Sequence, residues 1–126
     1  MHQNEIGSII VDCAVKLHKN LGPGLLESVY EVVLAKQLQL AGLTAHRQVP
    51  VPIIYEGISF DEGFRADLIV NQSVIIELKS VETVHPVYKK QLLTYLKLTG
   101  HKLGYLLNFG DELMKNGITR IINGTL

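Results

Sequence analysis

The stretch that decides the fold runs from Arg65 to Lys79 and reads RADLIVNQSVIIELK. Two short apolar runs, 64–70 and 74–78, flank the turn-forming residues Asn-Gln-Ser at 71–73, a pattern that predicts a β-hairpin. Charged side chains interrupt this apolar context at Asp67, Glu77 and Lys79. Charges within a core hairpin are costly unless they are paired or bind a metal ion. The hairpin is therefore both the centre of the predicted fold and the first place to look for a site.

The length of the hairpin loop decides whether these charges meet. Side chains alternate along a strand, so Glu77 and Lys79 share one face. A three-residue loop over 71–73 places Asp67 opposite Glu77 and on that same face. A two-residue loop instead places Asp67 opposite Ile76 and turns Glu77 to the other face. The sequence permits both registers, and only the first assembles a cluster.

The remaining elements follow from apolar periodicity and from glycine and proline breaks. In chain order we predict helices over 6–21 and 26–41, strands over 49–55, 64–70 and 74–78, a helix over 86–99, and a strand over 103–109. Pro50 and Pro52 make the first strand an edge strand. Residues 56–63 contain a turn at Glu56-Gly57 and suggest a mobile loop, and 118–122 fits either a short strand or a helix. This order predicts one α/β domain over residues 1–126, with helices packed on a mixed sheet.

The composition is that of a globular domain and excludes several other classes of protein. The chain has 126 residues, of which 47% are apolar and 19% charged, as expected for one globular domain. A single cysteine excludes an internal disulfide framework and a cysteine-rich zinc module. No apolar run approaches the roughly 18 residues of a membrane span, and the first residues do not resemble a signal peptide. We therefore expect a cytoplasmic protein that does not bind membranes.

The charges are balanced overall but separated along the chain. Twelve basic and twelve acidic residues give a net charge of zero, whereas proteins that bind nucleic acid over their whole surface are usually basic. Residues 56–77 hold five acids and one base, and residues 79–102 hold five lysines and one acid. This separation suits a cation site beside a phosphate-binding surface. Ordinary solvated faces produce the same pattern.

The side chains of the hairpin suit a particular chemistry. Asp67, Glu77 and a main-chain carbonyl offer the hard oxygen ligands that Mg²⁺ or Mn²⁺ prefers. A metal ion beside Lys79 can activate a water molecule and stabilise charge on a phosphate. A structural ion pair at a strand end would give the same short spacing, and such motifs recur by accident.

Further candidates lie on the helices and on the first hairpin strand. Gln91 and Tyr95 lie four residues apart on one helix face, where they can orient the lysine, a water or a phosphate, or can be half-buried structural residues. Arg65 shares the strand face of Asp67. It can bind phosphate or only neutralise a carboxylate. Lys89 and Lys90 are candidates for contact with phosphate, although a solvated helix start is the simpler interpretation.

These motifs resemble a known group of proteins. The D-x₉-E-L-K pattern followed by Q-L-L-T-Y resembles the PD-(D/E)xK, restriction-endonuclease-like nuclease superfamily, although Ala66 replaces the proline of that name. The segment 24–30, GLLESVY, is similar to the signature of the small GxxExxY protein family, and the likeness covers nearly the whole chain. The resemblance implies a restriction-endonuclease-like α/β/α sandwich with a central mixed sheet.

The resemblance also implies roles for individual residues. Asp67 and Glu77 would bind the metal together with the Leu78 carbonyl, and Glu27 would be the additional acidic ligand. Lys79 would position or activate the attacking water, with Gln91 and Tyr95 lining the site.

We therefore predict a Mg²⁺- or Mn²⁺-dependent nuclease that acts on nucleic acid, with DNA as the favoured substrate. The alternative is a non-catalytic module that keeps the nuclease fold and binds nucleic acid or protein. The small size and neutral charge favour a homodimer or a larger complex for gripping the substrate. The choice between DNA and RNA, and between endo- and exonuclease action, stays open.

Overall fold

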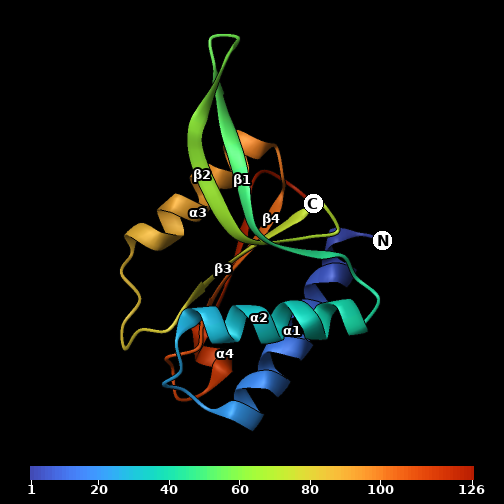
Figure 1. The fold of residues 1–126 in the computed structure, drawn as a ribbon, viewed down its shortest axis with the longest axis vertical. Helices are drawn as coiled ribbons and strands as arrows, with labels where there is room; N and C mark the ends of the chain where they lie inside the picture. Colours follow the sequence, from blue (N-terminus) through green and yellow to red (C-terminus); the bar gives the residue numbers. More distant parts are fainter.

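The computed structural model describes all residues, Met1–Leu126, as one mixed β-sheet with helices on both faces (Figure 1). The elements are α1 (Gln3–Leu21), α2 (Glu27–Leu40), β1 (Ala45–Tyr55), β2 (Ile58–Val70), β3 (Val74–Lys79), α3 (Val87–Thr99), β4 (Leu103–Asn108), α4 (Met114–Gly117) and β5 (Ile118–Ile122). The predicted α/β sandwich with a central mixed sheet is confirmed.

The sheet has five strands in the order β1-β2-β3-β4-β5. Strands β3 and β4 are parallel, and the other neighbouring pairs are antiparallel. A parallel pair needs a crossover connection, which α3 provides between β3 and β4. Strand β1 lies at the edge of the sheet, as its two prolines predict.

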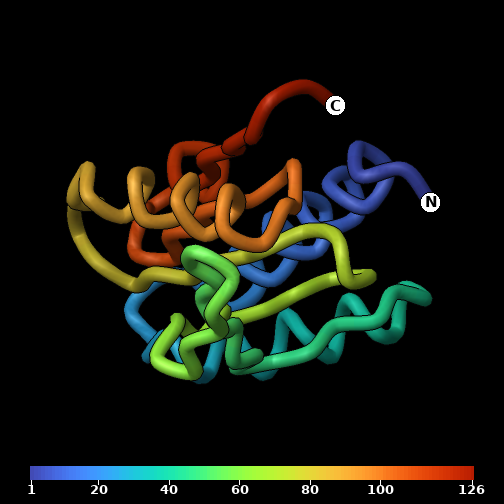
Figure 2. The backbone as a smooth tube through the Cα atoms, turned by 90° about the horizontal axis from the view of Figure 1, so that it is seen from above, coloured from blue at the N-terminus to red at the C-terminus, as the bar shows by residue number.

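The two faces of the sheet are covered unequally. Helices α1 and α2 cover one face and share with it a core of 20 buried residues. Helix α3 covers the other face, where the core has six buried residues. Figure 2 shows α2 and α3 on opposite sides of the strands. The smaller core leaves room for polar side chains between α3 and the sheet.

Strands β1 and β2 form a long hairpin that extends beyond the rest of the sheet (Figure 1). Its turn, Glu56-Gly57, has positive φ at both residues, as tight hairpin turns require. The register shifts between Val51 and Ile53, and Gly63 lies so close to the Val51 carbonyl that a side chain there would clash. The expected loop over 56–63 is therefore wrong beyond the turn, because β2 already begins at Ile58.

The other differences from the predicted elements are small. Helix α1 begins three residues early, since the His2 ring accepts a hydrogen bond from the Asn4 amide at 3.0 Å and caps the helix. Residues 118–122 form a strand, and the four-residue helix α4 before it was not predicted. No helix combines the length and the apolar character that crossing a membrane requires.

Candidate active site

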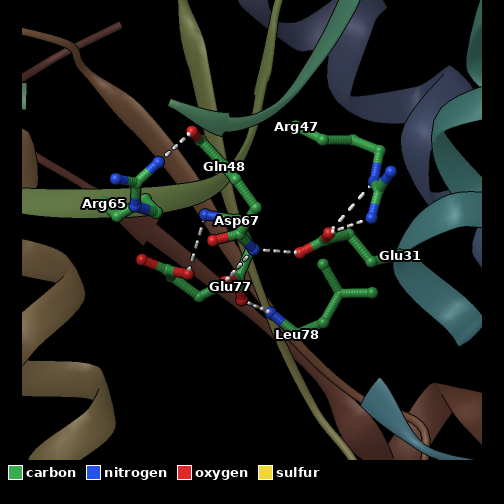
Figure 3. A network of polar contacts seen from close by, with 7 residues as sticks. All are labelled: Glu31, Arg47, Gln48, Arg65, Asp67, Glu77 and Leu78. Carbon is green, nitrogen blue, oxygen red and sulfur yellow. Dashed lines mark hydrogen bonds and ion pairs between the residues drawn. The ribbon is translucent and has the colours of Figure 1, made fainter. Parts of the chain in front are cut away.

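The pairing of β2 with β3 resolves the question of register. Leu68 pairs with Ile76 and Val70 with Val74, which leaves 71–73 as a three-residue loop. Asp67 and Glu77 occupy the next position. There the strands are joined by hydrogen bonds between main-chain amides and the two carboxyl groups instead of by a main-chain pair (Figure 3). The Asp67 amide donates to Glu77 Oε2 at 3.3 Å, and the Leu78 amide donates to Asp67 Oδ2 at 2.9 Å. The two carboxylates therefore lie together where the strands begin to separate.

A cavity of about 170 Å³ opens at this point between the sheet, α3 and the start of α2. It brings together seven of the side chains singled out in the sequence: Glu27, Arg65, Asp67, Glu77, Lys79, Gln91 and Tyr95. Tyr88 and Leu106 complete the lining. Residues separated by up to 79 positions in the chain, from Glu27 to Leu106, thus surround one polar cavity.

The cavity disfavours a second negative charge beside Asp67. Burial is the main cause that raises the pKa of Glu77, to about 9, and the side-chain hydrogen bond with Asp67 and the charge of Asp67 raise it further, whereas the hydrogen bond from the Asp67 amide lowers it. Lys79 acts in the opposite direction, although the structure has no ion pair between it and either carboxylate. Two close carboxyl groups that form no ion pair are a site that a cation would stabilise.

Aromatic rings contact two of the side chains that line the cavity, Lys79 of β3 and Tyr95 of α3. The Lys79 Nζ lies 4.0 Å from the centre of the Tyr88 ring, in a cation–π contact. Tyr95 stacks on Phe64 of β2, with ring centres 3.7 Å apart. Burial first, and then the charges of Glu77 and Asp67, raise the pKa of the Tyr95 hydroxyl, so it remains a hydrogen-bond donor at neutral pH.

Glu27 reaches the cavity because the turn before α2 is fixed. The buried Tyr30 hydroxyl donates to the Gly22 carbonyl at 2.5 Å and accepts from the Leu25 amide at 3.1 Å. Ser80, just after β3, donates to the Leu25 carbonyl at 2.6 Å. These bonds attach the start of α2 to the end of β3. Tyr30, which lies one turn from Glu27, is therefore structural and does not line the cavity.

Other candidates lie elsewhere. Lys89 and Lys90 are exposed on the first turn of α3 and do not line the cavity. Leu78 buries its side chain in the larger core, and its main-chain amide contacts Asp67. His18 is hydrogen-bonded to the Asp111 carbonyl at 2.7 Å and does not line the cavity.

The residues present fit a divalent cation by their chemistry. Asp67 and Glu77 supply carboxylate oxygens, the ligands that Mg²⁺ prefers, at one polar cavity. The structure contains no group of three or more acidic, histidine or cysteine side chains arranged for metal binding. Glu27 therefore lines the same cavity without completing a three-carboxylate cluster.

Sequence reasoning missed two features near the site. Tyr88 precedes Gln91 by three residues and Tyr95 by seven, so its helical spacing was a usable signal. Gln48 contacts both Glu31 and Asp67 from the edge strand, and no local pattern indicates this. The contact depends on packing between segments far apart in the chain.

Comparison with known proteins places this architecture in a class. The model of the PD-(D/E)XK nuclease superfamily matches residues 4–121, so the chain belongs to that superfamily. Its members generally use divalent metal ions. No curated protein and no solved structure matches the chain.

Proposed function

We propose that this protein is a Mg²⁺- or Mn²⁺-dependent nuclease that hydrolyses phosphodiester bonds in DNA. The observation that carries the proposal is the convergence of Asp67, Glu77 and Lys79 on one polar cavity. Two adjacent carboxylates and a lysine are a combination suited to metal-assisted hydrolysis of phosphate esters. Membership of the nuclease superfamily supports the same assignment.

Each side chain has a role in this proposal. Asp67, Glu77 and the Leu78 carbonyl would hold the cation, with Glu27 as a further acidic ligand. A bound divalent ion supplies a more acidic water and stabilises charge on phosphate oxygens. Lys79 positions or activates the water. The Tyr95 hydroxyl and the Gln91 amide donate hydrogen bonds to the phosphate or orient Lys79.

The charges around the cavity suggest how the substrate is held. Arg65 lines the cavity and would contact the scissile region of the strand. Lys89 and Lys90 lie outside it, where they would contact flanking phosphates. With a net charge of zero, one copy has no excess of positive charge for holding a duplex, and a homodimer would double the basic surface beside the cavity.

The test is cleavage of single-stranded, duplex and branched DNA and of RNA, with Mg²⁺, Mn²⁺ or EDTA. We expect cutting that requires metal and is lost in Lys79→Ala. Calorimetry with Mn²⁺ on wild type and Asp67→Ala measures cation binding separately. If neither protein cuts and no binding depends on Asp67, the chain is a binding module that keeps the nuclease fold. Cation binding without cutting would indicate a missing partner or an untested substrate.

A further inference from the structure

Gln48 has a backbone conformation that its position in a strand does not explain. Four residues other than glycine have positive φ, and three of them lie in hairpin turns: Glu56, Asn71 and Gln72. Gln48 has φ 52° inside β1, between residues paired regularly with β2. A left-handed residue other than glycine is costly, and such strain concentrates at functional sites. The contacts of the Gln48 side chain should therefore show which interaction this conformation permits.

Its contacts lead to the cavity. Arg47 pairs with Leu68 and Val49 with Ala66, so Gln48 lies across from Asp67. The Gln48 Nε2 atom lies 2.6 Å from Glu31 Oε1 and 3.4 Å from Asp67 Oδ1 (Figure 3). One amide group has two hydrogens, and the two carboxylates can accept one each. The Gln48 amide therefore connects helix α2 to the site carboxylate.

The surroundings fix the amide in this position. Glu31 is buried and also pairs with Arg47 at 3.0 Å, so its negative charge is compensated. The main-chain carbonyl of Gln48 accepts a hydrogen bond from Arg65 Nη1 at 3.1 Å. Gln48 is thus held at both its side chain and its main chain, by residues of α2 and β2.

The arrangement controls the orientation of Asp67 without adding charge. Asp67 Oδ2 accepts from the Leu78 amide and Oδ1 from the Gln48 amide, so both oxygens are restrained. Each oxygen keeps further lone-pair capacity for a cation. A neutral amide restrains the carboxylate without competing with a cation, as a lysine or arginine would.

We propose that Gln48 is a positioning residue: anchored by Glu31 and Arg47, it orients Asp67 for cation binding. This inference rests on the proposed function, because it assigns Asp67 to the cation. Groups that orient metal ligands in this way typically change metal affinity 10- to 100-fold when they are removed.

The first test compares Gln48→Gly with Gln72→Gly by calorimetric titration with Mn²⁺. Both glutamines are exposed and left-handed, so glycine keeps either backbone unstrained. We expect Mn²⁺ to bind Gln48→Gly about tenfold more weakly and Gln72→Gly like wild type, with the Tm of Gln72→Gly at or above that of wild type. In cleavage, Gln48→Gly should need about tenfold more Mg²⁺ for half-maximal rate, with the substrate KM unchanged. Wild-type affinity in Gln48→Gly would overturn the inference.

The second test needs no metal. In the metal-free protein, we expect the Tm changes of Gln48→Gly and Asp67→Ala to be non-additive in the double variant, because the two side chains interact. Additive changes would overturn the inference. If wild type binds no Mn²⁺, the cation site of the proposed function fails, and this cycle alone decides whether Gln48 positions Asp67.

Discussion

The two faces of the sheet differ in what occupies them. The face under α1 and α2 is a continuous apolar core of 20 buried residues, in which the aromatic rings of Tyr30 and Phe109 stack at 4.4 Å. The face under α3 has six buried core residues, and a polar cavity takes the remaining space. Under the proposed function, the face under α1 and α2 stabilises the fold, and the face under α3 carries the reactive groups.

The strongest test of this division is Lys79→Ala. We expect metal-dependent DNA cleavage to fall about 100- to 10,000-fold, as is typical when a group that assists proton transfer or charge stabilisation is removed. The Tm should remain close to that of wild type, since Lys79 makes no ion pair. Lys102→Ala, an exposed lysine outside the cavity, is the matched control and should cut normally. Cleavage by Lys79→Ala within a few-fold of wild type would contradict its role.

The opposite outcome is expected for Leu34→Ala on the apolar face. Leu34 is fully buried in the larger core, so the truncation should lower the free energy of unfolding by about 2–5 kcal/mol. Denaturant titration measures this loss. Cleavage per folded molecule, measured at low temperature, should be unchanged. A selective loss of activity would show that the two faces are not independent.

Glu77→Gln should change stability and cation binding in opposite directions: the metal-free protein becomes more stable, and Mn²⁺ binding is lost. Because burial and Asp67 raise the pKa of Glu77 to about 9, the folded protein binds this proton more tightly than the unfolded chain. The metal-free protein should therefore lose stability as the pH rises from about 4.5 to about 9. Glu77→Gln should remove most of this dependence and stabilise the metal-free protein by about 1–3 kcal/mol at pH 7, while Mn²⁺ binding is lost.

Unfolding free energies measured between pH 5 and pH 9 in EDTA check this sign. Glu82→Gln, which changes an exposed carboxyl, is the matched control and should keep the wild-type profile. A Glu77→Gln protein less stable than wild type at pH 7 would show that the carboxyl group stabilises the fold.

The smallest effect is expected at Tyr88. Exposed cation–π contacts contribute about 0.5–1 kcal/mol, so Tyr88→Leu should slow cleavage about two- to fivefold through a less restrained Lys79. Tyr88→Phe keeps the aromatic face and should cut at nearly the wild-type rate. Equal losses in both variants would assign the effect to the hydroxyl group instead of the ring.

Much of the fold was predictable because its signals are local. Apolar spacing and the Gly22-Pro23-Gly24 break predict the first two helices, and the hairpin over 64–78 is bounded by turn residues. The start of β2 at Ile58 was missed, because the two acids and the glycine at 61–63 are typical of a loop. Pairing with β1 keeps that segment extended although most of it is exposed.

The residues around the cavity were predictable only in part. The sequence identifies Asp67, Glu77 and Lys79 as unusual in a hairpin, but the register that joins them was open until the strand pairing was known. The left-handed Gln48 has no local signal, since glutamine rarely adopts this conformation. Its position depends on Glu31 and Arg65, which belong to other elements.

The prolines of β1 have a consequence for how copies of the chain can associate. An exposed edge strand is a template on which another chain can add a strand, which leads to fibres or extended sheets. Pro50 and Pro52 lack the amide donors that such an addition needs, so β1 is a poor template. The opposite edge, β5, contains no proline. A sheet continued across two molecules would therefore form through β5 and leave the β1 edge free.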